Sequence, residues 1–203
     1  MSHDEHSGHS GHQEHRFEDP ESYAERWNAP ERDAWQQPQA IIDAMELEGA
    51  MKVADLGAGT GYFLPFLSAA VGPEGEVFAI DTESSMLSYI DKQMQAAGLS
   101  NVTTVQADAS SSGLQEQSVD RILSVNVWHH IPNRGSYSQH LFERLRPGGS
   151  VWIVDFLEDS PMGPPLEHRL PPEVVLEELR AGGFDASIHP LALERQYLIV
   201  GKR

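Results

Sequence analysis

Three glycines at alternate positions carry the strongest chemical signal in this sequence. Residues 53–61 read VADLGAGTG, so a short apolar run leads into Gly57, Gly59 and Gly61 before a helical pattern begins. Glycine lets the backbone turn tightly and approach a ligand closely. The Gly-x-Gly-x-x-Gly spacing of dinucleotide sites is absent, because Thr60 is followed at once by Gly61. We expect a ligand-binding turn between a strand and a helix, with a purely structural turn as the alternative.

An acidic residue beside this loop indicates the charge of the ligand. Asp55 stands at the end of the apolar run, immediately before the glycines. A carboxylate there repels a pyrophosphate and suits a ligand that carries positive charge. S-adenosylmethionine has an ammonium group and a sulfonium group and no phosphate. The charge at this position therefore favours S-adenosylmethionine over a dinucleotide.

Two further acids follow the next two expected strands. Asp81 stands twenty residues after Gly61, where a carboxylate can accept hydrogen bonds from both ribose hydroxyls. The alternative is that Asp81 caps the following helix. Asp108 either accepts a hydrogen bond from the adenine amino group, while the backbone of Ala109 donates one, or is a plain surface acid. The other expected donor-binding residues are Thr82, Met86 (against the adenine face, or simply in the core) and Asn126.

Two adjacent histidines are candidate general bases. His129 and His130 follow the expected strand over residues 119–125, on the side of a parallel sheet where ligands bind. An unperturbed imidazole titrates near neutrality, which suits proton removal. Adjacent side chains point in different directions, so we expect at most one of the two to face the site while the other packs or is solvated.

A proline-rich segment over residues 163–172 holds a third candidate base. Glu167, His168 and Arg169 lie between prolines, which stiffen the loop. These three residues form either a fixed polar cluster at a pocket for the methyl acceptor, or an anchor in which Glu167 and Arg169 pair. Asp155, at the end of the preceding expected strand, is a further candidate.

Residues 17–48 are expected to form a helical lid. Prolines interrupt this segment and favour short helices separated by breaks. The segment carries Tyr23, Trp27, Arg32 and Trp35. Its aromatic side chains either close over the donor or attach the helices to the sheet. We favour attachment for Trp35 and leave both roles open for Tyr23 and Trp27.

The elements that must position these residues alternate between strand and helix. Expected strands cover residues 51–56, 77–80, 102–106, 119–125, 151–156, 184–189 and 196–200. Expected helices cover residues 38–47, 62–71, 84–97, 137–145 and 172–180. This alternation indicates an α/β fold with a parallel sheet, helices on both faces, and ligands beyond the carboxyl ends of the strands.

Composition narrows the function further. The 203 residues include 14 Lys and Arg against 31 Asp and Glu, a net charge of −17, which disfavours nucleic acid and anionic membranes as partners. The absence of cysteine excludes disulfides, thiolate metal sites and cysteine nucleophiles. No apolar stretch approaches the length of a membrane span. We expect a cytoplasmic protein with one domain over residues 17–203, in which residues 49–203 form the donor-binding sheet.

A histidine-rich tail precedes that domain. Residues 1–16 contain almost no apolar side chains and are expected to be disordered. Their histidines recur every third residue: His3, His6, His9, His12 and His15. Imidazoles suit divalent transition metals, so the tail either binds such ions weakly or merely adds solubility. We expect no defined metal site.

The order of motifs resembles a known family. Residues 51 to about 156 resemble a class I S-adenosylmethionine-dependent methyltransferase, with VADLGAGTGYF, FAID, QADA, VDRILSVNVWHHI and LRPGGSVWIVDF in the family's order. The resemblance implies a Rossmann-like, doubly wound, seven-stranded sheet of order 3-2-1-4-5-7-6, with the last strand antiparallel, between two helical layers. It also implies donor binding at matching positions: Asp55, Gly57, Gly59, Gly61, Asp81 and Asp108. The whole chain is similar to small bacterial methyltransferases of undefined substrate.

We therefore expect an enzyme that methylates a small-molecule acceptor by in-line displacement. The Asn/Asp-Pro-Pro-aromatic signature of nucleobase amino methylation is absent after the fourth expected strand. The lack of cysteine also excludes C5-pyrimidine methylation through a thiol adduct, and it removes the thiolate ligands of arsenite methyltransferases. The alternative is a metal-responsive protein that uses the histidine tail, with the donor domain as a carrier.

Overall fold

A seven-stranded sheet forms the centre of the protein. The computed structural model describes residues 19–203, so the histidine tail over residues 1–16 lies outside the described part. The strands lie in the order β3-β2-β1-β4-β5-β7-β6, as the resemblance implied. Their bounds are β1 Lys52–Leu56, β2 Glu76–Asp81, β3 Val102–Gln106, β4 Val119–Val125, β5 Leu145–Phe156, β6 Asp185–Ile188 and β7 Gln196–Lys202. Strand β7 runs antiparallel to both neighbours, and the other paired strands are parallel.

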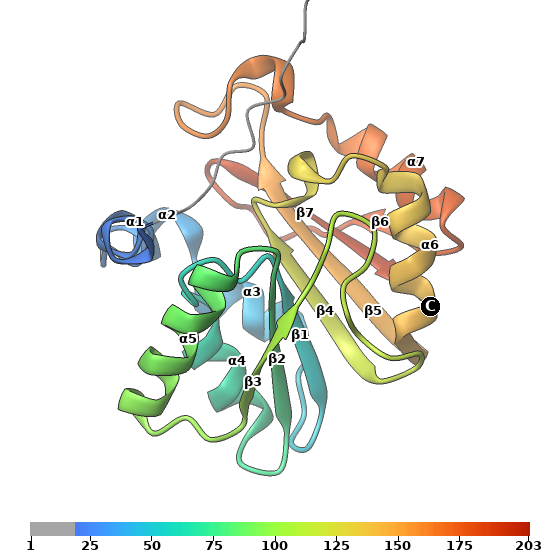
Figure 1. Ribbon diagram of the computed structural model, residues 1–203. Helices are drawn as coiled ribbons and strands as arrows, with labels where there is room; N and C mark the ends of the chain where they lie inside the picture. Colours follow the sequence, from blue (N-terminus) through green and yellow to red (C-terminus); the bar gives the residue numbers. More distant parts are fainter. Residues whose placement is uncertain (1–18) are drawn as a thin grey trace, which may run out of the picture.

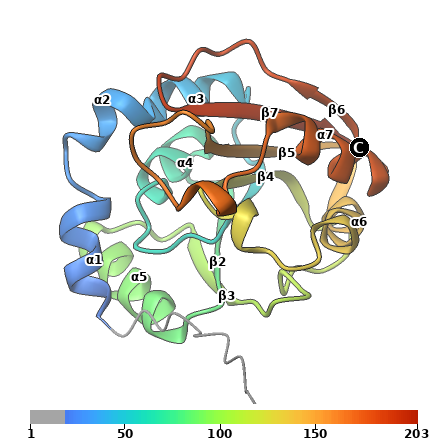
Figure 2. The same ribbon diagram turned by 90° about the horizontal axis from the view of Figure 1, so that it is seen from above.

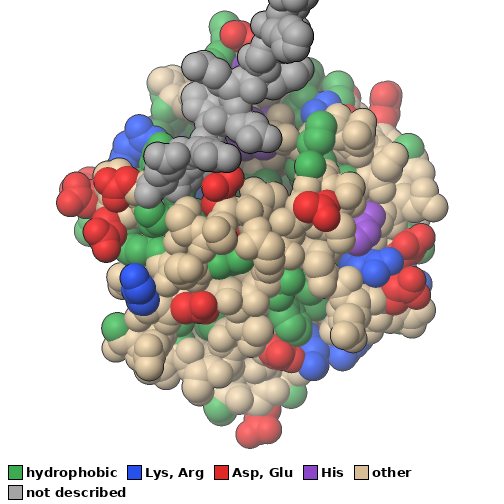
Figure 3. Space-filling view, in the orientation of Figure 1, with side chains coloured by type: hydrophobic (Ala, Val, Ile, Leu, Met, Phe, Trp, Pro, Cys, Tyr) green, Lys and Arg blue, Asp and Glu red, His purple; other side chains and the backbone are tan. Residues whose placement is uncertain are grey.

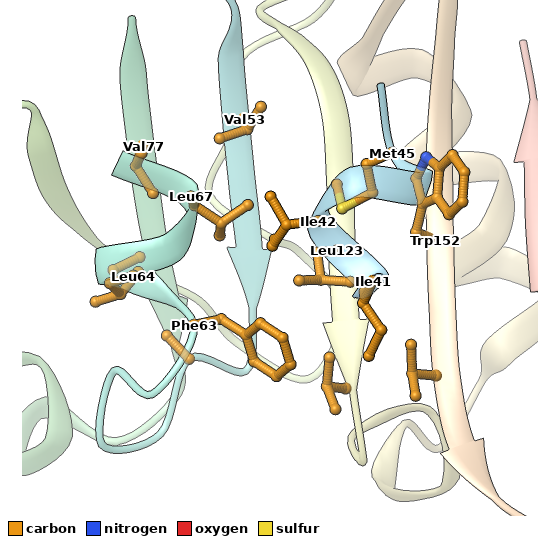
Figure 4. Packing of buried hydrophobic residues seen from close by; sticks show 14 of the residues in the cluster. Ile41, Ile42, Met45, Val53, Phe63, Leu64, Leu67, Val77, Leu123 and Trp152 are labelled. Atoms are coloured by element: carbon orange, nitrogen blue, oxygen red, sulfur yellow. The ribbon is translucent and has the colours of Figure 1, made fainter. Parts of the chain in front are cut away.

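Helices cover both faces of this sheet, which confirms the three-layer architecture (Figure 1). Helices α3 (Pro38–Ala44), α4 (Leu64–Val71) and α5 (Ser84–Ala97) pack on one face, and helices α6 (Arg134–Arg144) and α7 (Pro172–Ala181) pack on the other. Figure 4 shows the first of the two cores, where side chains of α3 and α4 meet strand residues such as Val53 and Leu123. Because adjacent strand residues point to opposite faces, Ala54 belongs to the second core.

Two short helices precede the sheet at its carboxyl edge. Helix α1 (Pro20–Trp27) begins at a proline, where Asp19 accepts a hydrogen bond from the backbone N–H of Ser22 at 3.3 Å. Helix α2 (Arg32–Gln36) ends at Gln37, whose left-handed φ of 50° turns the chain into α3. Seen from above, α1 lies beside α5, and α2 lies beside α3 (Figure 2). The prolines thus separate short helices, as expected.

Two turns of 3-10 helix follow the carboxyl ends of β4 and β5. The first, η1, covers Trp128–His130, and the second, η2, covers Leu166–His168. Each expected histidine base therefore sits beyond a parallel strand end, on the side where α/β sheets bind ligands.

One strand begins earlier than expected. We expected a strand over residues 151–156, but β5 already begins at Leu145. Leu145 pairs with Val119 and Ser150 pairs with Arg121, so the register shifts between the two pairs. Pro147 and Gly148 lie in the irregular stretch between these two pairs, where the strand can accommodate a proline and a glycine with a left-handed φ of 80°.

Candidate functional site

The glycine loop joins β1 to α4 and depends on space that only glycine leaves. The N–H groups of Gly57 and Ala58 both donate to the carbonyl of Ile80 at 2.8 Å, which fixes the loop on β2. Gly57 has a φ of 74°, and a Cβ added there would lie 2.4 Å from Cγ2 of Val127. The loop therefore excludes any side chain at Gly57 for two independent reasons, its φ and the contact with Val127.

Asp81 holds this loop through its carboxylate. Its Oδ2 accepts a hydrogen bond from the N–H of Gly59 at 2.8 Å, and its Oδ1 accepts one from Glu83 at 3.0 Å. Burial raises the pKa of Asp81, while the hydrogen bonds from Glu83, Gly59 and Thr82 act in the opposite direction. Helix α5 begins after Glu83 and has no side-chain cap, so Asp81 ties the loop to the start of α5 and does not act as its capping residue. Sequence analysis missed this bond to Gly59.

Asp55 is a buried acid in β1 whose carboxylate makes no hydrogen bond within residues 19–203. Its exposed fraction is 3%. Burial and, to a lesser degree, the charge of Asp81 raise its pKa to about 7, against the opposing charge of Arg32. A desolvated carboxylate that makes no hydrogen bond within the described residues is suited to a cationic group of a ligand.

These residues fit the donor that the sequence suggested. The ammonium group of S-adenosylmethionine would meet the carboxylate of Asp55, which makes no hydrogen bond within residues 19–203, and the bare backbone around Gly57 and Gly59 would let the nucleoside approach. A nucleotide would place phosphate beside the carboxylates of Asp55 and Asp81. The buried charges therefore match the expected class of ligand.

The N-terminal helices dock directly on the glycine loop. Asn28 accepts a hydrogen bond from the hydroxyl of Thr60 at 2.7 Å and donates one to its carbonyl at 3.4 Å. The ring of Trp27 lies 3.5 Å from where a Cβ of Gly59 would be. Tyr23 packs against Trp27 with ring centroids 4.7 Å apart. Tyr23 and Trp27 therefore lie over the loop, whereas Trp35 stacks on Phe156 with centroids 6.3 Å apart.

Arg32 fixes α2 beside the acid of β1. Its Nη1 donates to the carbonyl of Trp27 at 2.8 Å, and its guanidinium lies 3.9 Å from the ring centroid of Tyr62. Burial lowers the pKa of Arg32 to about 10, against the opposing effect of Tyr62, Asp55 and Asp33. The hydroxyl of Tyr62 in turn donates to Asp33. Arg32 thus remains a cation that faces the buried carboxylate.

The expected adenine-binding residues lie in different environments. Asp108 is exposed, and its Oδ1 accepts hydrogen bonds from the N–H and the hydroxyl of Ser110, both at 2.7 Å, which lower its pKa. Ala109 lies in the same turn. The carbonyl of Thr82 accepts a hydrogen bond from Gln106 at 2.5 Å. Met86 is 1% exposed on α5, so its side chain packs inside the protein.

A neutral imidazole supports that turn. The Nε2 of His140 accepts a hydrogen bond from the N–H of Ser112 at 3.0 Å and lies 2.9 Å from its hydroxyl. Burial lowers the pKa of His140, which keeps Nε2 free to accept. The ring of His140 thus positions the turn that carries Asp108.

The two side chains best placed for acid–base catalysis, His129 and Asp155, are paired at the ends of β4 and β5. Nδ1 of His129 lies 2.9 Å from both carboxylate oxygens of Asp155, and both side chains are 3% exposed. The backbone N–H of His129 also donates to Asp155 at 3.3 Å, and the N–H of Phe156 donates to it at 2.9 Å. Because carboxylate oxygens accept, the pairing places a proton on Nδ1, and in the neutral imidazole Nε2 is then the nitrogen with the free lone pair. Sequence analysis named both residues but not their pairing.

The other two expected bases are less constrained. His130 is exposed, and its ring centroid lies 4.1 Å from that of His129. His168 is exposed in η2, beside the exposed Glu167. Of the two adjacent histidines, only His129 has a buried side chain, and the expectation that at most one of them faces the site stays a prediction.

Arg169 anchors the proline-rich loop, but not through Glu167. No ion pair joins Arg169 to Glu167 within the described chain. Instead the guanidinium donates to four backbone carbonyls: Ser160 at 2.7 Å, Glu158 and Pro164 at 2.9 Å, and Leu157 at 3.4 Å. Carbonyls that converge on a donor-only group satisfy the guanidinium as well as a carboxylate would. The alternative in which Arg169 pairs with Glu167 is therefore wrong for the described residues, and a polar cluster of Glu167, His168 and Arg169 at the acceptor pocket stays a prediction.

Replacing Arg169 with Met is expected to loosen the loop over residues 157–171. Losing these charged hydrogen bonds removes about 1.5–3 kcal/mol of local stability, which raises the open population about tenfold or more. Limited chymotrypsin digestion would then cut faster after Leu166, whose exposed fraction is 69%. Arg146→Met is the control, because within residues 19–203 the Arg146 guanidinium bonds Asp120 alone, which lies outside this loop. An unchanged cleavage rate in the Arg169 variant would contradict the anchor.

Within residues 19–203, no group of three or more His, Cys, Asp and Glu side chains could hold a metal ion. No helix in this range is long and apolar enough to cross a bilayer. The metal-binding expectation for the histidine tail concerns residues outside the described part.

Comparison with known proteins agrees with this geometry. Residues 53–149 match a protein family described as a methyltransferase domain. A solved S-adenosylmethionine-dependent methyltransferase from Aquifex aeolicus superposes with a TM-score of 0.84 at 25% identity, over 91% of this chain and 98% of that one. Residues 53–149 thus form a methyltransferase domain, and the fold around it is that of the class I S-adenosylmethionine-dependent methyltransferases. S-adenosylmethionine is the methyl donor of this family.

Curated relatives of this methyltransferase differ in what they act on. A ubiquinone/menaquinone biosynthesis C-methyltransferase from Pasteurella multocida is 30% identical over 116 residues, which cover 57% of this chain and 43% of the relative. A protein-L-isoaspartate O-methyltransferase from Methanothermobacter thermautotrophicus is 26% identical over 113 residues, which cover 56% of this chain and 49% of the relative. The chain thus spans about half the length of these relatives.

Proposed function

We propose that this protein transfers a methyl group from S-adenosylmethionine to a hydroxyl of a small-molecule acceptor, with His129 as the general base. The observation that carries the proposal is the buried pair of His129 and Asp155 at the carboxyl ends of β4 and β5. Asp155 holds the Nδ1 proton, so Nε2 is the atom that can take a proton from the acceptor. S-adenosylmethionine supplies a methyl carbon already activated by its sulfonium.

The residues of this chain would contribute alignment and proton removal. The acceptor oxygen attacks the methyl carbon in line with the leaving sulfur, the carbon–sulfur bond breaks, and the hydroxyl proton passes to Nε2 of His129. Asp155 acts as the positioning residue, since it fixes the ring of His129 and stabilises the imidazolium that forms. The donor-binding residues proposed from the sequence hold the nucleoside on the other side of the reacting carbon.

Charge and enclosure support a small acceptor over a macromolecule. The sequence carries a net charge of −17, and Figure 3 shows the described Lys and Arg side chains scattered among acidic ones on this face. A nucleic acid would need a basic surface. The strand ends lie between the N-terminal helices and the loop over residues 157–171 (Figure 2). Among the relatives, the Pasteurella protein's name points to a small quinone and the archaeal one's to a protein, and we favour the small molecule. From the composition we also propose that the protein is cytoplasmic.

Two variants test the base with a readout that structural damage would not mimic. His129→Gln is expected to lower kcat about 100- to 10,000-fold, as loss of a general base does, while affinity for S-adenosylhomocysteine stays within about twofold of the wild type. Asp155→Asn is expected to lower kcat similarly, because an amide favours the wrong tautomer of His129. The control is His189→Gln, whose ring lies against Trp152 on the opposite face of the sheet.

The assay supplies isotopically labelled S-adenosylmethionine to a metabolite extract. Label in the small-molecule fraction that depends on His129 supports the proposal. Label confined to protein or nucleic acid would overturn the small-molecule acceptor, and full activity of His129→Gln would overturn the base.

A further inference from the structure

A chain of hydrogen bonds runs from α2 to the end of β4 through two buried amide side chains. Arg32 donates to Oε1 of Gln36 from Nη2 at 3.1 Å and from Nε at 3.4 Å. Nε2 of Gln36 donates to Oε1 of Gln196 at 2.7 Å, and Nε2 of Gln196 donates to Oδ1 of Asn126 at 2.6 Å. Gln36 and Gln196 are 0% and 2% exposed, so water cannot replace these bonds. We call these four side chains the amide relay.

The guanidinium at one end fixes the direction of the whole relay. Arginine has only donors, so Gln36 must turn its oxygen toward Arg32 and its NH₂ toward Gln196. Gln196 then presents its oxygen to Gln36 and its NH₂ to Asn126. Asn126 is left with its oxygen occupied and its NH₂ directed away from the relay. Flipping any one amide would place two donors or two acceptors against each other in the interior.

Asn126 occupies a strained position beside the expected reaction centre. It follows β4 directly and has a φ of 61°, in the left-handed region that asparagine tolerates better than most residues. Its backbone N–H donates to Val154 on β5 at 2.8 Å, which places Asn126 at the same strand ends as His129. The side-chain Nδ2 makes no hydrogen bond within residues 19–203, and the residue is partly exposed. Strain of this kind persists at binding sites when the surroundings hold it in place.

We propose that the amide relay holds Asn126 as a fixed hydrogen-bond donor for an oxygen acceptor on a ligand, a carboxylate or carbonyl group. Gln36 and Gln196 are positioning residues, and Asn126 contacts the ligand. The proposal deepens the proposed function and rests on it for the identity of the site. The oxygen belongs either to the amino-acid carboxylate of the donor or to the methyl acceptor.

Gln196→Glu tests the polarity with almost no change in shape. A carboxylate only accepts, so it satisfies Gln36 and forces Asn126 to rotate and donate to residue 196. The ligand then faces Oδ1 of Asn126 and not its NH₂. Asn126→Asp is the second variant: it keeps the buried amides in place and presents an acceptor to the ligand. The charge control is Gln37→Glu, because Gln37 is next to the relay in sequence and, within the described residues, its side chain bonds only the carbonyl of Ala192, at 3.5 Å.

The first measurement is calorimetric titration with S-adenosylhomocysteine and with its decarboxylated analogue. If the oxygen belongs to the donor, Gln196→Glu and Asn126→Asp lose at least about tenfold affinity for S-adenosylhomocysteine, as expected for a charged hydrogen bond, and keep their affinity for the analogue. If the oxygen belongs to the methyl acceptor, both variants keep the wild-type affinity for S-adenosylhomocysteine and for its analogue. The control Gln37→Glu is expected to keep the wild-type affinities in either case.

The second measurement uses benzoate and benzylammonium as probes of the complex with S-adenosylhomocysteine. If the oxygen belongs to the methyl acceptor, the wild type binds benzoate in preference to benzylammonium, and both variants reverse that preference. Gln196→Met is a neutral variant that breaks the relay, and it is expected to lower the affinity for benzoate without raising the affinity for benzylammonium. A reversed preference in the other two variants therefore cannot come from damage to the fold. If Gln196→Glu and Asn126→Asp change neither of the two titrations, the proposal that the amide relay holds Asn126 as a donor is overturned. Label found only in macromolecules, with the polarity reversal intact, would overturn the proposed function alone.

Discussion

Replacing Asp55 with Asn is expected to remove most of the pH dependence of donor binding. The pKa of Asp55 is raised to about 7, chiefly by burial, so below this pH the site must lose a proton before a cationic donor binds. Affinity for S-adenosylhomocysteine is then expected to fall up to about tenfold for each pH unit below 7 and to level off above it. In Asp55→Asn the affinity at pH 8 is lower by about 10- to 100-fold, the usual value of a charged hydrogen bond.

The same substitution is expected to stabilise the protein without ligand. A carboxyl group whose pKa is higher in the folded state binds more protons there than in the unfolded state, so stability falls as pH rises from about 4 to 7. With a shift of about three pH units, the loss is on the order of 4 kcal/mol above pH 7. Asparagine does not ionise, so Asp55→Asn is expected to unfold at a higher temperature at pH 8 and near the wild-type temperature at pH 5.

Calorimetry in two buffers of different ionisation enthalpy measures both effects. Near pH 6 the wild type should release close to one more proton per bound S-adenosylhomocysteine than Asp55→Asn does. Asp81 remains in the variant and its raised pKa leaves a residual dependence. Asp185→Asn, at an exposed position on β6, serves as the charge control. Equal proton release in both proteins, or a less stable Asp55→Asn at pH 8, would sink the assignment.

Adding one methyl group at Gly57 is expected to abolish donor binding and to destabilise the fold. The new Cβ would lie 2.4 Å from Val127, and the residue would keep a φ of 74°. The left-handed backbone costs about 1 kcal/mol, and overpacking adds about 1–3 kcal/mol. The loop can escape only by moving, which changes the backbone that faces the nucleoside. Urea denaturation and titration with S-adenosylhomocysteine measure the two effects.

Gly98→Ala is a matched control for the backbone part of this cost. Gly98 ends α5 with a φ of 71°, and a Cβ there meets nothing within 4 Å. The Gly98→Ala variant should lose about 1 kcal/mol of stability and bind the donor normally. The double variant Gly57→Ala with Val127→Ala should recover the part of the stability that Gly57→Ala loses through overpacking against Val127. If Gly57→Ala behaves like Gly98→Ala, the close approach of Val127 does not matter.

Sequence patterns predicted most of the fold because its elements carry local signals. The helix over Ser84–Ala97 and the strands over Val102–Gln106 and Val119–Val125 were predicted at their observed bounds. Each has a periodic apolar pattern with glycine, asparagine or serine at its ends. The early start of β5 was not predicted, because Pro147 and Gly148 normally end elements, whereas here they form an irregularity within a paired strand.

The site was predicted in its parts and not in its connections. Asp55, Asp81 and His129 were each found from charge or residue type at strand ends. No local pattern shows that His129 pairs with Asp155 or that Gln36 pairs with Gln196, because the partners lie on different strands and helices. Glutamine has no strong positional preference, so a buried amide pair leaves no periodic trace in one sequence. Such links follow only from the packing of the whole domain.

The bond between Gln36 and Gln196 also bears on how the chain is made. Its two partners lie 160 residues apart. During synthesis, the segment that carries Gln36 leaves the ribosome long before β7 exists to receive it, although domains begin to fold from the amino terminus as they emerge. The N-terminal helices therefore cannot seat fully on a nascent chain. A premature stop codon before position 196 would leave a polypeptide whose glycine loop is complete but whose α2 lacks its anchor, a species suited to capture by chaperones and proteases.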